Sequence, residues 1–203
     1  MMRWQMKKLN YDILIPKLEK NIYNLNEDEV EIYFQWYMEQ LPIRVAYVSK
    51  VCASELHIPI ERMDCSPESL VLLWKWFRRR AKTEQVVHGE AEEKEKRLIA
   101  SRKIERQLTL ETEYILRDIG MYLGETFRKN IPQIYWSYYT KPRRDFFVNR
   151  PLLKGFIDRT AGHPFEAVFE PIHMVHIQAV KIMKNTSKDA DLLNIYNVWA
   201  NKV

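Results

Sequence analysis

Apolar side chains recur every three or four residues in several stretches of this chain, the spacing that puts them on one face of a helix. The clearest run follows Asn26 and comprises Val30, Tyr33, Phe34, Tyr37, Met38 and Leu41. Asn26 suits the N-cap, and the acidic residues 27–29 complement the positive end of the helix dipole. Because proline lacks an amide hydrogen, Pro42 predicts a break and a second helix from Pro42 to Glu55.

A third helix is predicted after Ser66, Pro67 and Glu68, which read as N-cap, first helical position and acidic first turn. Its apolar stripe consists of Leu70, Leu73, Trp74 and Phe77. With a weakly helical arm from Tyr11 to Asn24, these helices predict a helical N-terminal lobe over residues 1–82.

Charged residues dominate the segment 83–106, where Glu92 with Lys96 and Glu93 with Arg97 have i, i+4 spacing. This composition predicts a solvated connecting helix between the lobes. The second lobe covers residues 107–203, and we expect the two lobes to pack as one compact unit.

A helix beginning after Thr109 contains Gly120 and Gly124, one turn apart. Each glycine inside a helix costs about 1 kcal/mol relative to alanine, so a compensating contact is expected. The close approach of a strand or of another helix would supply that contact.

Alternating large side chains follow, with Ile134, Trp136 and Tyr138 on one face of a predicted strand. After a loop at residues 140–145, we expect a second strand at Phe146–Val148 and a short third strand at Gly155–Ile157. Further helices are predicted from Pro171 and across residues 189–199. The fold class predicted is α+β, mostly helical, with a small antiparallel sheet packed on helices in the C-terminal half.

Composition narrows the function without identifying it. The 203 residues are 46% hydrophobic and carry a formal charge of +5, which excludes disorder of the whole chain and permits an anionic partner. No apolar run approaches the roughly 18 residues of a membrane span, so we expect a cytoplasmic protein that does not bind membranes. Cys52 and Cys65 are interpreted as two reduced thiols.

Catalytic motifs do not stand out in the sequence. A G-x-S-x-G nucleophile turn, a P-loop and a G-x-G-x-x-G turn are all absent, and no cofactor is expected. One alternative is a metal-dependent enzyme, in which Glu170, His173 and His176 would share a metal from one helix face. The spacing differs from H-E-x-x-H, and histidines making ordinary hydrogen bonds are the simpler interpretation.

The predicted hairpin carries the candidate binding residues, which combine aromatic rings with cations: Trp136, Tyr138, Tyr139, Lys141, Arg143 and Arg144. Aromatic and arginine side chains dominate protein interfaces, so another protein is the favoured partner. Nucleic acid is an alternative, since rings stack on bases and cations neutralise phosphates. A solvated hairpin tip above core aromatics explains the same pattern without a ligand.

Three groups of residues also resemble those of uncharacterised families of small bacterial cytoplasmic proteins. They are residues 33–36 with 41–45, residues 66–70 with 74–77, and the glycine-bearing residues 120–125. Some proteins of that appearance accompany polymorphic toxins as immunity proteins. The resemblance implies a bacterial accessory protein, non-enzymatic and immunity-like, whose partner is another protein such as a toxin. It brings no active-site pattern with it.

Overall fold

A computed structural model describes residues 10–16, 18–85, 106–160 and 162–203 of the chain. Its helices are α1 (Glu27–Leu56), α2 (Ser69–Arg80), α4 (Leu110–Asn130), α5 (Pro171–Met183) and α6 (Asp191–Ala200), with 3₁₀ turns η1 (Ile22–Asn24) and η2 (Ile60–Arg62). Its strands are β1 (Thr83–Gln85), β2 (Arg106–Leu108), β3 (Tyr135–Ser137), β4 (Leu152–Asp158) and β5 (Phe165–Phe169). The predicted α+β class is confirmed, including the small antiparallel sheet in the C-terminal half.

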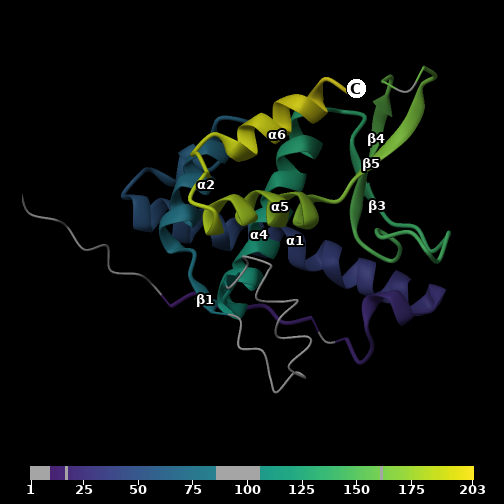
Figure 1. Ribbon diagram of the computed structural model, residues 1–203, viewed down its shortest axis with the longest axis horizontal. Helices are drawn as coiled ribbons and strands as arrows, with labels where there is room; N and C mark the ends of the chain where they lie inside the picture. The colour runs from purple at the N-terminus through teal and green to yellow at the C-terminus, as the bar shows by residue number, and fades with distance from the viewer. Residues whose placement is uncertain (1–9, 17, 86–105, 161) are drawn as a thin grey trace, which may run out of the picture.

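Helix α4 stands in the middle of the molecule, with the sheet β3-β4-β5 on one side and α2 on the other (Figure 1). Helices α1, α2, α5 and α6 all contact it. One hydrophobic core cluster joins buried residues from both predicted lobes, Tyr37 and Trp74 from the first and Phe127 and Phe156 from the second. Residues 86–105 of the predicted connecting segment 83–106 lie outside the described residues, and the ends of that segment belong to β1 and β2, which pair antiparallel.

Helix α1 begins as predicted. The Asn26 side chain accepts a hydrogen bond from the Glu29 amide at 2.9 Å, and Glu29 accepts one from the Asn26 amide at 2.8 Å, which completes a capping box. The predicted break at Pro42 is wrong, because α1 continues through this proline to Leu56. Pro42 is exposed while its neighbours Leu41 and Arg44 are buried, so packing on both sides of the proline holds the helix together.

The chain before α1 is also different from the prediction. Residues 10–16 carry no helix, and the only regular turn before residue 25 among the described residues is η1. Side chains hold this arm in place: Tyr11 donates to Asp118 Oδ2 at 2.6 Å, Arg44 to the Asp12 carbonyl at 2.6 Å, and Arg117 to the Leu14 carbonyl at 2.9 Å.

Helix α2 starts at Ser69, three residues after the predicted N-cap. Ser66 nevertheless performs the capping function, since its Oγ accepts a hydrogen bond from the Ser69 amide at 3.3 Å. At the other end, Arg80 is buried and forms an ion pair with Glu55 of α1, while the Trp76 indole donates to Glu55 at 2.7 Å.

The two glycines of α4 meet the contacts that the sequence requires. A Cβ at Gly120 would lie 2.8 Å from the Cα of Ile172, so α5 packs there backbone to backbone. A Cβ at Gly124 would lie 2.2 Å from the Trp136 ring, so the indole of β3 comes directly against the α4 backbone. The prediction that glycine allows a close approach is confirmed at both positions.

The sheet differs from the prediction beyond its first strand. The predicted strand at Phe146–Val148 is wrong, because these residues form turns in the long loop between β3 and β4. The strand predicted at Gly155–Ile157 belongs to the longer β4, which pairs antiparallel with β3 and with β5. Strand β5 is not among the predicted strands, although its apolar residues Phe165, Ala167 and Phe169 occupy every second position.

The last two helices both pack on α4, and α6 also contacts α2. Pro171 opens α5 as predicted, and Val175 and Ala179 of this helix are buried. The Phe127 ring of α4 lies 4.9 Å from Phe169 and 4.7 Å from Tyr196, centroid to centroid, which joins α4, β5 and α6 in one aromatic cluster. Within the described residues, no helix has the length and apolar character needed to span a membrane.

Candidate functional site

The aromatic residues predicted to bind a partner are largely engaged within the protein. Trp136 is buried between Gly124 and Tyr37, whose ring centroid lies 5.4 Å away, and its indole nitrogen donates to Glu125 Oε1 at 2.9 Å. The Tyr138 hydroxyl is hydrogen-bonded to Glu31, and Tyr139 donates to Asp145 Oδ1 at 2.6 Å. The bond to Glu31 raises the pKa of Tyr138, and burial followed by the Asp145 bond raises the pKa of Tyr139. Trp136 therefore offers no free face, and both tyrosines are half-buried anchors of the loop.

The predicted cations all lie on the exposed loop between β3 and β4. Lys141 forms an ion pair with Glu27 at 3.1 Å, and Arg143 donates to the Leu25 carbonyl at 3.0 Å. Arg144 is exposed and has no hydrogen-bond or ion-pair partner in the part of the chain that the structure describes. We call Lys141, Arg143 and Arg144 the basic rim. These cations are exposed, whereas Trp136 beside them is buried.

Next to the basic rim, the structure brings together a cluster that the sequence did not reveal. We call it the Arg150 cluster, and it consists of Tyr23, Phe146, Phe147, Arg150 and His173. The Arg150 guanidinium lies 4.9 Å from the Phe146 ring centroid and 5.3 Å from that of Tyr23, and it donates to the Tyr23 hydroxyl at 2.7 Å. Phe146 is 51% exposed and Tyr23 is 37% exposed. The cluster is thus a preformed surface of rings around one arginine.

Its members come from η1, the β3–β4 loop and the first turn of α5, which are far apart in the sequence. Tyr23 and Arg150 are separated by 127 residues. No local spacing marks such a contact, and the sequence shows only the adjacent rings Phe146 and Phe147, of which Phe146 is exposed. Their sequence pattern predicts a strand, which does not indicate an exposed ring at Phe146.

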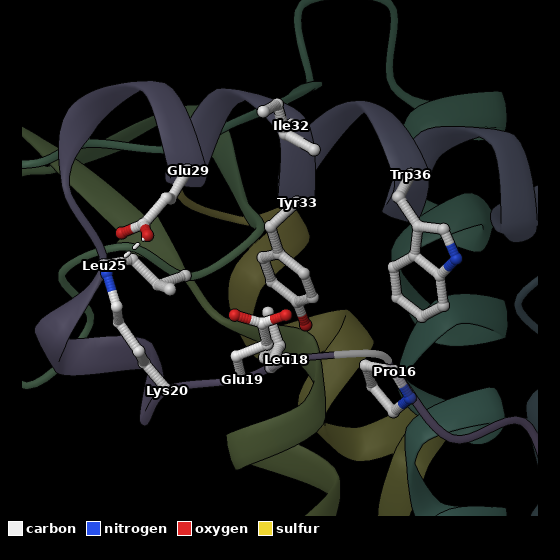
Figure 2. A pocket seen from close by; sticks show the side chains of 9 residues that line it. All are labelled: Pro16, Leu18, Glu19, Lys20, Leu25, Glu29, Ile32, Tyr33 and Trp36. Atoms are coloured by element: carbon white, nitrogen blue, oxygen red, sulfur yellow. Dashed lines mark hydrogen bonds and ion pairs between the residues drawn. The ribbon is translucent and has the colours of Figure 1, made fainter.

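A pocket of about 450 Å³ lies between the arm and the N-terminal half of α1. Figure 2 shows Tyr33 and Trp36 pointing from α1 toward the arm at Leu18 and Pro16, with their ring centroids 5.7 Å apart. At the other end Lys20 pairs with Glu29 at 2.6 Å. Leu25 lines this arm pocket and also accepts the Arg143 bond, so the pocket adjoins the basic rim.

The proposed metal ligands face different partners. Glu170 is the N-cap of α5 and accepts a hydrogen bond from the His173 amide. The His173 ring lies 4.9 Å from Phe146, centroid to centroid, while His176 Nδ1 lies 3.2 Å from Glu113. Among the described residues, no three His, Cys, Asp or Glu side chains are grouped so that they could hold a metal ion.

Of the three predicted metal ligands, Glu170 has the pKa that its surroundings shift most. It is 2% exposed, and burial raises its pKa to about 7 against the lowering effects of the His173 amide and Arg150. The nearby Tyr37 hydroxyl is fully buried, without a hydrogen-bond partner in the described chain, and burial followed by Glu170 raises its pKa. A carboxyl that titrates near neutral pH suits acid–base chemistry, but this one is enclosed and serves as a helix cap.

No family model matches this chain, and neither a curated protein nor a solved structure is detectably similar to it.

Proposed function

We propose that the protein is a non-enzymatic protein-binding module whose interface is the Arg150 cluster together with the basic rim of Lys141, Arg143 and Arg144. The observation that carries this proposal is the exposed Phe146 ring held against Arg150. Aromatic and arginine side chains are the residues in which binding energy concentrates at interfaces. Here their rotamers are already fixed by mutual contacts, which lowers the entropy lost on binding.

The charge of the surface indicates the chemistry of the partner. Arg144 has no counter-ion among the described residues, and the rim is basic in a chain of formal charge +5. A partner with acidic groups around an apolar centre is complementary to it, and such charges mainly speed association and select the partner. The immunity-like role, with a toxin as partner, rests on the resemblance of the helical segments. A cytoplasmic location agrees with the two free, buried cysteines.

Capture from an extract of the source cells, followed by quantitative mass spectrometry, tests the interface. The double variant Phe146→Ala with Arg144→Ala should lose one protein that the unchanged chain captures. The matched control is Phe165→Ala with Arg159→Ala, which removes an exposed ring and an exposed cation from the β5 side.

With the captured protein purified, the binding change can be measured by calorimetry. Removing one hot-spot ring costs about 2 kcal/mol or more, so Kd should rise by roughly 30-fold for Phe146→Ala and stay within about twofold for the control. Equal capture by all three folded proteins would mean that this surface is not the interface. Co-expression with a candidate toxin tests the immunity-like role by itself.

A further inference from the structure

A second surface, distinct from the Arg150 cluster, runs along the C-terminal half of α1. It is a groove of about 850 Å³ between three segments: α1 from Pro42 to Ser54, the chain from Ile58 to Cys65, and the end of α4 at Glu125–Lys129. We call it the α1 groove. Along α1 it extends from Pro42 to Ser54, which are 12 positions apart, or about 18 Å at the rise of an α-helix.

Apart from Lys50, the α1 wall of this groove is formed by short side chains. The exposed row Pro42, Ala46, Lys50 and Ser54 has a spacing of four residues, and the neighbouring buried row Val45, Ser49 and Ala53 has the same spacing. Rows with a spacing of four are the ridges that interdigitate when two helices pack. Because Ala46 and Ser54 are short, another helix can approach α1 closely here. Opposite them, Ile60 remains 47% exposed beside the buried Met63.

The rim of the α1 groove carries uncompensated positive charge. Arg128 is neutralised by Glu125, to which it donates at 2.7 and 2.6 Å. Lys50 and Lys129 are exposed, and neither forms an ion pair with any described residue. The groove therefore combines an apolar floor with two exposed ammonium groups that form no ion pair with a described carboxylate, although Lys129 also interacts with Cys65.

We propose that the α1 groove binds an amphipathic α-helix of a partner protein that carries acidic residues beside its apolar stripe. An extended peptide fits less well, because strand addition needs a row of free backbone groups and the α1 wall bonds its own backbone within the helix. A helix brings its i, i+3, i+4 and i+7 side chains into such a groove instead. Its carboxylates would meet Lys50 and Lys129 at the rim.

A phage library of 16-residue peptides, panned on the intact chain, tests this proposal without a known partner. The selected peptides should show apolar residues at helical spacing and a net negative charge. Fluorescence anisotropy should then give a Kd that rises more than tenfold for Ala46→Trp, which fills the groove from an exposed position. The matched control Asn197→Trp on α6 should leave Kd unchanged.

The charge reversals Lys50→Glu and Lys129→Glu together should weaken binding by about tenfold and flatten its salt dependence, since exposed pairs contribute below 1 kcal/mol each. Reversals at Lys184 and Arg159 are the control. Selected peptides that are basic, extended or insensitive to Ala46→Trp would overturn the proposal, as would a library that yields no binder.

Two further outcomes separate this inference from its neighbours. Self-association in sedimentation velocity that Ala46→Trp abolishes would assign the groove to a second copy of the chain and overturn the proposal. Peptide binding lost in Phe146→Ala with Arg144→Ala would place the peptide on the Arg150 cluster and overturn it too. The proposal does not rest on the protein-binding role of that cluster, so either can fail alone.

Discussion

The contact between Gly124 and Trp136 makes a quantitative prediction. In the substitution Gly124→Ala, the new methyl group would lie 2.2 Å from Cζ2 and 2.4 Å from Cη2 of the indole, and 3.3 Å from Pro171 Cγ. Carbon atoms in contact are about 3.5–4.0 Å apart, so the ring must move by more than 1 Å. The ring is buried against Tyr37 and bonded to Glu125, and it cannot move without giving up those contacts.

The magnitude follows from three effects. Helix propensity alone favours alanine by about 1 kcal/mol. Overpacking of a filled core costs about 1–3 kcal/mol. Loss of the Trp136–Glu125 hydrogen bond leaves the buried indole N–H without an acceptor, at a cost of about 1–3 kcal/mol, while Arg128 still donates to Glu125. The net destabilisation is about 3 kcal/mol, which for a chain of this size lowers Tm by roughly 6–12 °C.

Urea unfolding measures this loss of stability in four proteins: the unchanged chain, Gly124→Ala, Trp136→Leu and the double variant. In the Trp136→Leu background the alanine should cost less than about 1 kcal/mol, because the atoms it strikes are gone. Gly120→Ala is the control, since its clash is with Ile172 and should not be relieved. A Gly124→Ala chain as stable as the unchanged one, or an equal cost in both backgrounds, would refute the reasoning.

Two other predictions concern buried charges. Asp118→Ala should destabilise the fold by about 3–5 kcal/mol in urea unfolding, because the Arg44 guanidinium and the Tyr11 hydroxyl lose their shared acceptor. The double variant Asp118→Leu with Arg44→Met should be destabilised less than the single variant, because it leaves no buried charge unpaired. A double variant no better than the single one would contradict this. The pKa of Glu170 is raised to about 7 in the fold, so the folded protein favours the neutral carboxyl. The contribution of this group to the unfolding free energy is fully present below pH 4.5 and is lost as pH rises toward 7, by about 3 kcal/mol at most. Between pH 5 and pH 8, the unfolding free energy of the unchanged chain should therefore fall by more than that of Glu170→Gln. If the two proteins show the same change with pH, Glu170 is not the group involved.

Local signals in the sequence were sufficient where a single element determines its own structure. The Asn26 capping box, the Thr109 cap and the Pro171 start are short-range contacts, and all three helices begin there. The glycines of α4 also indicated a close approach without revealing that the two neighbours are Trp136 and α5.

The wrong predictions concern segments whose secondary structure depends on contacts that the local pattern does not show. Pro42 is a helix breaker in isolation, but Leu41 and Arg44 are buried on either side of it, and Arg44 is bonded to Asp118 of α4. Phe146–Val148 reads as a strand, yet Asp145 accepts hydrogen bonds from the Phe147 amide and from Tyr139, which closes a turn.

The candidate site shows the same division. The basic loop was identified from its composition, and Arg144 is indeed exposed there. The Arg150 cluster depends on Tyr23 meeting residues more than 120 positions later, which no periodicity encodes. Conversely, Trp136 is predicted to bind a partner but is buried, because a pattern of rings does not distinguish a packed face from an open one.

The central position of α4 has a consequence for local opening. Every other helix of the described chain, and β3, lies against α4, so its backbone amides cannot reach solvent unless those contacts separate together. In native-state hydrogen exchange, amides in the middle of α4 should exchange only through global unfolding, and their protection would report the full free energy of the fold. The β1–β2 ribbon has no such cover on its exposed residues and should exchange through local opening first.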